Sequence, residues 1–301
     1  MPALNKKIRV SKKYLPWLSL AILLTTIALI VHFFVVHPTY ILQLRHVRPL
    51  TVLLVVVLYM PMVIILTLVY GSLVKLCGKQ IVFKENLLLT SYSTLVNFFG
   101  PLQSGPGVRA AYLKGKHQVR IRDYTLATLI YYGFFASFSA LFLLAGNRPW
   151  WQTTLVVVAV ATLSFAVIRR SAGGTQHQTG ESRFRLHGGL LITLALTTLL
   201  QLALTTACYY VELKTVNSHI SLGQAISYCG AANFAVFVSL TPAAIGFRET
   251  FLTLSQHFHH VSTANILGAN IIDRGAYLIY LLLLFVFVMA MHVRGQLHIK
   301  S

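Results

Sequence analysis

The sequence contains very few acidic residues, with 6 Asp and Glu against 25 Lys and Arg in 301 residues. The chain therefore has few acidic residues from which a catalytic pair of carboxylates could be formed. The sequence also lacks a Gly-x-Ser-x-Gly nucleophile elbow, a His-Glu-x-x-His metal motif and a phosphate-binding Gly-Lys-Ser/Thr loop. We expect a protein that is not an enzyme and that has no nucleotide site of its own.

Cysteine is scarce too, because only Cys77, Cys208 and Cys229 occur, all in or beside apolar segments. Their spacing suits neither a zinc site nor a disulfide framework, so we predict small packing residues. The His-Phe-His-His run that ends at His260 has no carboxylates nearby at metal spacing. It is predicted to lie in a solvated outer loop, with pH sensing as the alternative. We expect no metal and no cofactor.

Apolar residues are abundant: 56% of the chain is hydrophobic, 10% is charged and the mean hydropathy is +0.71. Several apolar runs approach or exceed the about 20 residues that cross a bilayer. The sequence therefore predicts an integral membrane protein. The formal net charge of +19 is attributed to cytoplasmic loops and anionic lipid head groups rather than to nucleic acid.

The distribution of basic residues gives the predicted topology. Lysine and arginine flank the N-terminal side of the first apolar run and the C-terminal side of the last, so both termini are expected in the cytoplasm. A polar segment, 169–187, is predicted to be a flexible cytoplasmic linker. The six predicted spans are 15–36, 50–74, 124–145, 150–168, 188–211 and 264–292.

Two further apolar stretches, 91–109 and 227–248, resemble each other. Each begins Ser-Tyr, carries Asn-Phe at its sixth and seventh places, reaches a proline and ends Gly-apolar-Arg. The offset between them is 136 residues at the Ser-Tyr end and 139 at the arginine. We interpret them as the two copies of an internal duplication, with repeats at 50–145 and 188–292.

Both stretches are predicted to be re-entrant hairpins of broken helices. The first, 87–108, has basic residues on both flanks, so both flanks are expected on the cytoplasmic side. The second, 222–255, has weakly charged flanks and is expected to enter from the outside. Backbone breaks at membrane depth require burial in protein or a wet cavity. The predicted fold is an all-α polytopic membrane protein, a single membrane domain over 1–301 with an inverted repeat like those of many transporters.

The chain resembles the flippase-like family that includes the transmembrane region of lysylphosphatidylglycerol synthases. The resemblance rests on Asn97, on Pro101 to Arg109, on Pro242 to Glu249 and on the stretch from Ala264 to Arg274. It implies a bacterial inner-membrane protein that moves a phospholipid or a lipid-linked head group between leaflets. We expect this chain to lack the soluble aminoacyl-transferase domain of the full synthases, so lysyl transfer does not carry over.

Two departures from the family pattern concern the breaks and the first repeat. Pro242-Ala243-Ala244 stands where the family usually has Pro-Gly-Gly, so the turn is less permissive. Tyr131-Tyr132 stands where the first half often has Glu-Arg, so that half lacks a charged anchor at this place.

The candidate substrate-binding residues gather at the two breaks. Arg109 and Arg248 each follow a break, where the start of a helix favours an anion and arginine can bind a phosphate. The alternatives are that Arg109 only starts a basic loop and that Arg248 pairs with a carboxylate. The turn residues assigned to the same site are Gly107, Gly246, Pro101 and Pro242.

The remaining candidates are charged or amide residues in apolar surroundings. Glu249, Asp273 and Arg274 need partners or water, because a charge at mid-membrane costs about 2.5–3.5 kcal/mol. An acid could take a coupling proton or form a static ion pair, and Arg274 is the stronger candidate for lipid contact. Asn97 and Asn233 either bridge freed backbone groups at the breaks or touch substrate.

Three functions remain open from the sequence. The first is a lipid translocase that binds an anionic phospholipid or lipid-linked substrate between the broken helices. The second is a non-transporting membrane subunit that supports a partner lipid synthase or glycosyltransferase. The third is a membrane enzyme that acts on a lipid head group.

Overall fold

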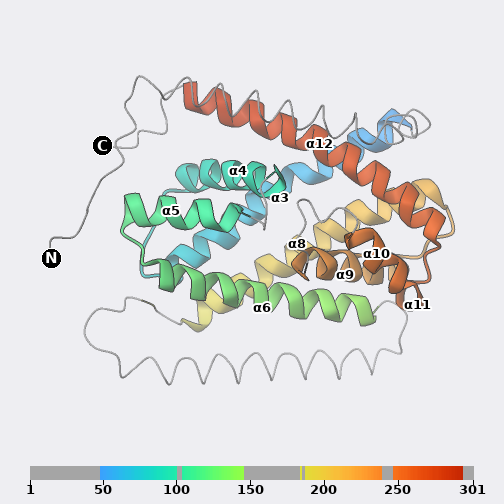
Figure 1. Cartoon of the computed structure of the whole chain (residues 1–301), viewed down its shortest axis with the longest axis horizontal. Coiled ribbons are helices and arrows are strands. Elements are labelled where there is room, and N and C mark those ends of the chain that lie inside the picture. The colour runs from blue at the N-terminus through green and yellow to red at the C-terminus, as the bar shows by residue number, and fades with distance from the viewer. Residues whose placement is uncertain (1–47, 100–103, 146–183, 185–186, 239–246, 294–301) are drawn as a thin grey trace.

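The computed structural model describes residues 48–99, 104–145, 184, 187–238 and 247–293 (Figure 1). Within these ranges every regular element is a helix. The predicted spans 15–36 and 150–168 and most of the predicted linker 169–187 lie outside the described residues. The helices are α3 (Pro49–Leu76), α4 (Phe83–Phe99), α5 (Gly105–His117), α6 (Ile121–Ala145), α8 (Gly188–Val216), α9 (Leu222–Val238), α10 (Phe247–Leu254), α11 (Gln256–His259) and α12 (Thr263–Val293).

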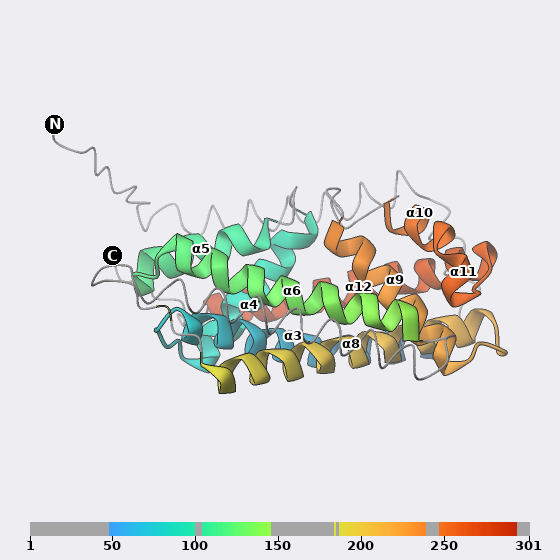
Figure 2. The ribbon, with the colours of Figure 1, turned by 90° about the horizontal axis from the view of Figure 1, so that it is seen from below.

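Four of these helices, α3, α6, α8 and α12, are long and apolar enough to cross a membrane. The shortest, α6, has 25 residues and is about 37 Å long at 1.5 Å per residue, against about 30 Å of hydrocarbon. All four extend along the long axis of the molecule in both ribbon views (Figures 1 and 2). The predicted class, an all-α polytopic membrane protein, is confirmed.

The outer faces of the long helices are apolar. On α3, Leu53, Val57 and Ile64 are exposed, and on α12 Leu283 and Val286 are exposed. In water such a surface would be unfavourable, but hydrocarbon chains are as apolar as leucine itself. The exposed face of the bundle therefore fits lipid as its solvent.

Each of the two predicted broken stretches forms a pair of short helices. α4 ends at Phe99 and α5 begins at Gly105, and the two arms pack against each other. α9 and α10 form the second pair in the same way. The first hairpin is longer than predicted, because α5 continues to His117 rather than ending near Val108. Pro106 in the first turn of α5 suits a helix start, since its missing N–H needs no partner there.

The hairpins open toward opposite ends of the molecule. α4 and α5 lie at the left of Figure 1 and connect there to α3 and α6, whereas α9 and α10 lie at the right and connect to α8 and, through α11, to α12. A long helix, a hairpin and a long helix therefore follow one another twice along the chain. The left end carries exposed basic side chains, and we call it the basic end: Lys75, Lys84, Lys114, Lys116, Arg120 and Arg122.

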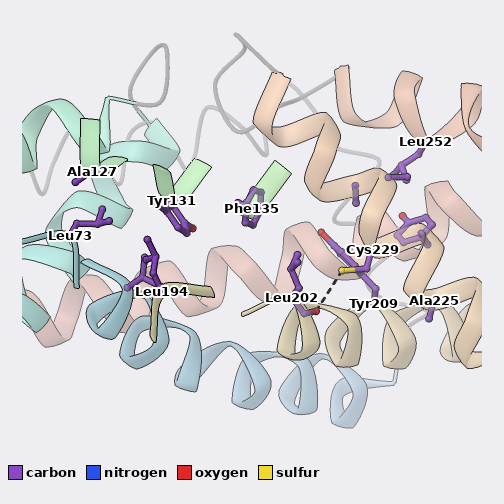
Figure 3. Close-up of a cluster of buried hydrophobic side chains, with 14 of the residues drawn as sticks. Leu73, Ala127, Tyr131, Phe135, Leu194, Leu202, Tyr209, Ala225, Cys229 and Leu252 are labelled. Atoms are coloured by element: carbon purple, nitrogen blue, oxygen red, sulfur yellow. Dashed lines mark hydrogen bonds between the residues drawn. The ribbon is translucent and has the colours of Figure 1, made fainter. Parts of the chain in front are cut away.

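The two halves meet where α9 packs on α6. At Gly230 a Cβ atom would lie 2.1 Å from the Leu143 backbone nitrogen and 2.5 Å from the Ser139 carbonyl oxygen, so only glycine fits. A buried cluster extends from this contact to α3 and α8 through Leu73, Tyr131 and Leu202 (Figure 3).

The three cysteines are buried and free, as predicted for packing residues. The Cys229 thiol donates to the Leu202 carbonyl oxygen at 3.7 Å, the contact drawn as a dashed line in Figure 3. Among the described residues, no group of three or more His, Cys, Asp or Glu is arranged to hold a metal ion.

Candidate functional site

A cavity of about 280 Å³ lies between the two hairpins. The first hairpin contributes Asn97, Gly105 and Pro106, and the second contributes Asn233 and Arg248. The long helices close the cavity with charged and aromatic side chains, among them Tyr59, Tyr70, Tyr131, Tyr132, Tyr209, Asp273, Arg274 and Tyr277. A volume of this size suits a polar head group rather than a whole phospholipid.

Arg248 and Asp273 form the central ion pair of this cavity. Arg248 Nη1 lies 2.5 Å from Asp273 Oδ2, and both side chains are more than nine-tenths buried. The second oxygen of Asp273 accepts a hydrogen bond from the Tyr59 hydroxyl. Removing either charge would leave the other uncompensated in a low-dielectric interior, at a cost of about 3–5 kcal/mol.

A second ion pair lies next to the first. Arg274 Nη2 donates to Glu249 Oε1 at 3.1 Å. Both ion pairs join α10 to α12, because Arg248 and Glu249 are neighbours on α10 while Asp273 and Arg274 are neighbours on α12. Four residues predicted as site residues are therefore brought together, and three of them line the cavity: Arg248, Asp273 and Arg274.

Aromatic rings form much of the cavity wall. The Tyr209 ring lies under the Arg248 guanidinium, with 5.1 Å between the guanidinium carbon and the ring centroid. Tyr131 donates to Gln201 Oε1 at 2.9 Å. The Tyr131-Tyr132 pair, where the family often has charges, thus supplies hydroxyl and ring surface to the site. Sequence reasoning had assigned none of these tyrosines.

Arg109 is buried beside the cavity and does not line it. Its Nη2 donates to Asn86 Oδ1 at 2.8 Å and its Nη1 to the Thr90 hydroxyl at 3.0 Å. The Tyr70 ring lies 3.7 Å from the guanidinium carbon. Arg109 therefore joins α5 to α4 and α3 through neutral groups, and it does not simply start a basic loop.

The two predicted asparagines both line the cavity. Asn97 Oδ1 accepts a hydrogen bond from the Gly105 N–H at 3.3 Å and so bridges the first break. Asn233 Nδ2 donates to Cys229 Sγ at 3.1 Å, one turn earlier on α9. The bridging role expected for Asn97 is present in the structure.

Gly105, rather than Gly107, is the glycine that the first hairpin requires. A Cβ at Gly105 would lie 2.7 Å from the Ser93 carbonyl oxygen, whereas one at Gly107 would meet nothing within 4 Å. The other predicted turn residues, Pro101, Pro242 and Gly246, lie outside the described residues.

Glu212 is a buried acid that the sequence prediction placed wrongly. The predicted span 188–211 ends just before Glu212 and so excludes it. In the structure α8 continues to Val216, and Glu212 is 0% exposed. The signal was present in the sequence, because apolar residues continue past Glu212 at Leu213 and Val216.

The histidine run is also only partly solvated. His257 and His260 are exposed, but His259 is buried: it donates from Nε2 to the Leu252 carbonyl oxygen and accepts at Nδ1 from the Val261 N–H. Burial lowers the pKa of His259 below its ordinary value. The prediction of a solvated loop was wrong for this residue.

A larger hollow of about 1050 Å³ lies at the far end from the basic end, between the start of α3, the end of α8 and the start of α12. Its walls are mostly apolar, and Arg48 and Lys214 are its charged residues among those described. Lys214 already donates to the Ser218 carbonyl oxygen at 2.7 Å. The smaller central cavity, where charges and both hairpins meet, is the better candidate for chemistry.

These features define a class of protein: a polytopic helical membrane protein with a charged cavity between two broken-helix hairpins. The chain belongs to the family described as the lysylphosphatidylglycerol synthase TM region, whose profile matches residues 16–284. That match confirms the family resemblance and associates the chain with lipid-related membrane processes. A search of curated proteins found no match.

Proposed function

We propose that this protein is a translocase that moves a phospholipid or a lipid-linked head group across the bacterial inner membrane. The observation that carries the proposal is the cavity of about 280 Å³ that both hairpins and four long helices enclose. Sites of this kind, between discontinuous helices at mid-membrane, are where many transporters bind their substrates.

The head group would bind through Arg248 and Arg274. Arg274 lines the cavity, and arginine can bind a phosphate through two hydrogen bonds at once. Arg248 lies in the first turn of α10, and the positive end of the helix dipole also favours an anion there. The acids beside the two arginines, Glu249 and Asp273, hold them in place when no substrate is bound.

The orientation in the membrane follows from charge. The basic end carries exposed Lys114, Lys116 and Arg122, and positive residues mark cytoplasmic loops. We therefore infer that the basic end faces the cytoplasm, and the basic residues near both ends of the sequence favour the same side for the two termini. The same exposed charges support the second candidate function, in which this face docks a partner lipid synthase or glycosyltransferase.

Leaflet exposure of a fluorescent phospholipid in proteoliposomes tests the proposal. We expect faster exposure with the protein than in empty vesicles, and a loss of at least about tenfold in Arg248→Ala and Arg274→Ala, as for a lost charge-assisted contact of about 1.4 kcal/mol or more. Arg248→Lys keeps the charge but loses the planar fork, so its rate should also fall. Arg122→Ala, at the exposed start of α6, is the matched control and should transport normally.

Two outcomes would remove the proposal. If lipid crosses no faster than in empty vesicles, the protein is not a translocase for that lipid class, and the docking function becomes the better one. If both Arg248→Ala and Arg274→Ala transport at the wild-type rate while remaining monodisperse, the cavity is not the site.

A further inference from the structure

Glu212 lies in the last turns of α8 with its carboxyl group fully buried. Neither of its oxygens has a hydrogen-bond partner among the described residues. The other buried acid in this region, Asp273, differs, because both of its oxygens are bonded, one to Arg248 and one to Tyr59. Glu212 is therefore an acid that the proposed lipid site does not use.

Among the described residues, Arg248 carries the one positive charge that acts on Glu212. Arg248 on α10 and Asp273 on α12 are the charged groups that act on it. The other titratable groups that face it are uncharged at neutral pH: Tyr59 on α3, Tyr228 and Cys229 on α9, and Cys208 and Tyr209 on α8 itself. Two carboxyl groups thus share a single guanidinium, and Asp273 already holds it at 2.5 Å.

A carboxylate in this position would be very unfavourable. An isolated buried charge costs several kcal/mol, and a group so placed takes up a proton instead. When two carboxyl groups share one site, the one with weaker support binds the proton. Asp273 has both an ion pair and a tyrosine hydroxyl, whereas Glu212 has neither within the described part of the chain.

We propose that Glu212 is a proton-binding site, and that release of its proton changes the cluster of Arg248, Asp273 and Glu212 from neutral to singly negative. The ionised Glu212 then competes with Asp273 for Arg248. Arg248 can donate hydrogen bonds to a second carboxylate, because its Nε and Nη2 have no hydrogen-bond partner among the described residues.

Infrared difference spectroscopy of the purified protein tests this without any transport assay. With only 6 acidic residues in the chain, the carbonyl band of a protonated carboxylic acid is easily assigned. At neutral pH the wild type should show this band, sensitive to deuteration, and Glu212→Gln should lose it. Asp123→Asn, a half-buried acid at the start of α6, is the matched control and should keep the band.

A second variant tests the competition for Arg248. In Asp273→Asn the guanidinium is free, so Glu212 should ionise to pair with it and the band should again disappear. If Glu212→Gln does not fold, this variant still tests whether Glu212 is the group that gives the band. The proposal fails if the wild type has no such band, if the band survives in Glu212→Gln, or if Asp273→Asn leaves it unchanged.

The consequence for transport rests on the proposed function. A singly negative cluster beside the cavity repels an anionic head group, so the exposure rate should fall as pH rises through the titration of Glu212. In Glu212→Gln this pH dependence should be absent, and a pH dependence equal to that of the wild type would contradict the coupling. If no protein-dependent transport occurs at all, the translocase proposal fails, while the infrared result still decides the proton site.

Discussion

The two hairpins bury an arginine at equivalent positions but compensate its charge differently. Arg109 and Arg248 are 139 residues apart, and so are Tyr70 and Tyr209, the rings that lie under their guanidinium groups. In the first hairpin the guanidinium donates to neutral oxygens of Asn86 and Thr90. In the second it pairs with the carboxylate of Asp273 beside the cavity.

In the proposed function, this difference gives the two arginines different roles. Neutral acceptors hold the two terminal nitrogens of Arg109, while its Nε has no hydrogen-bond partner among the described residues. The Arg248 pair lines the cavity, and its carboxylate has a second acid, Glu212, acting on it. In the proposed function, a substrate anion or a proton alters that balance.

The largest expected effect comes from Arg248→Met. It leaves the buried Asp273 without its positive partner, and we expect a loss of about 3–5 kcal/mol in unfolding free energy. Equilibrium unfolding in mixed micelles measures it. The double variant Arg248→Met/Asp273→Leu should regain most of the loss, because the unpaired charge is gone. No recovery in the double variant would mean that the pair is not the source of the cost.

The same substitution in the first hairpin, Arg109→Met, should cost less. It leaves neutral acceptors on Asn86 and Thr90 without a donor, and we expect a loss of about 1–3 kcal/mol. Unfolding in the same micelles allows a direct comparison of the two arginines. A loss equal to or larger than that of Arg248→Met would erase the distinction between the hairpins.

Gly105→Ala tests whether the first hairpin depends on close packing of its arms. The added Cβ would lie 2.7 Å from the Ser93 carbonyl oxygen and 2.9 Å from Asn97 Cβ, so α5 must move away from α4. Overpacking of this kind costs about 2 kcal/mol. Gly107→Ala, two residues along the same helix, meets nothing within 4 Å and should be neutral or slightly stabilising, since alanine favours helix. Thermal unfolding of the two variants should therefore differ, and equal midpoints would contradict the close approach.

Sequence reasoning could predict the breaks and the charged candidates, because Pro and Gly in an apolar run and charges in a span are local signals. It could not predict that the ion pairs form between α10 and α12, with Arg248 paired to Asp273 and Arg274 paired to Glu249. Which acid meets which arginine depends on the rotation of α10 against α12, which no local pattern encodes.

Two other features were readable but were not used. Asn86, Thr90 and Ser93 recur at helical spacing on α4 and form one polar face, which is where Arg109 binds. Glu212 is the second such feature, because the predicted span 188–211 stops just before it whereas α8 continues to Val216. The apolar residues Leu213 and Val216 beyond it could have extended the predicted span past Glu212.

The smallest effect is expected at the basic end of the first hairpin. There Glu85 on α4 accepts hydrogen bonds from Tyr112 and His117 on α5 and lies 3.0 Å from Lys116 Nζ. Burial alone would raise the pKa of Glu85, but the hydrogen bonds from His117, Tyr112 and Lys116 outweigh it and lower the pKa below its ordinary value. A lowered folded-state pKa means that Glu85 stabilises the fold at pH values above its unfolded pKa of about 4.3. This contribution disappears as the pH falls through the folded-state pKa.

Glu85→Gln should reduce the unfolding free energy by about 1 kcal/mol or less at neutral pH, as for other partly exposed pairs, and should weaken the loss of stability on acidification. Unfolding midpoints measured from neutral to acidic pH test the direction of this pH dependence. If the variant loses more stability in acid than the wild type, the contacts of Glu85 do not stabilise the packing of α4 against α5.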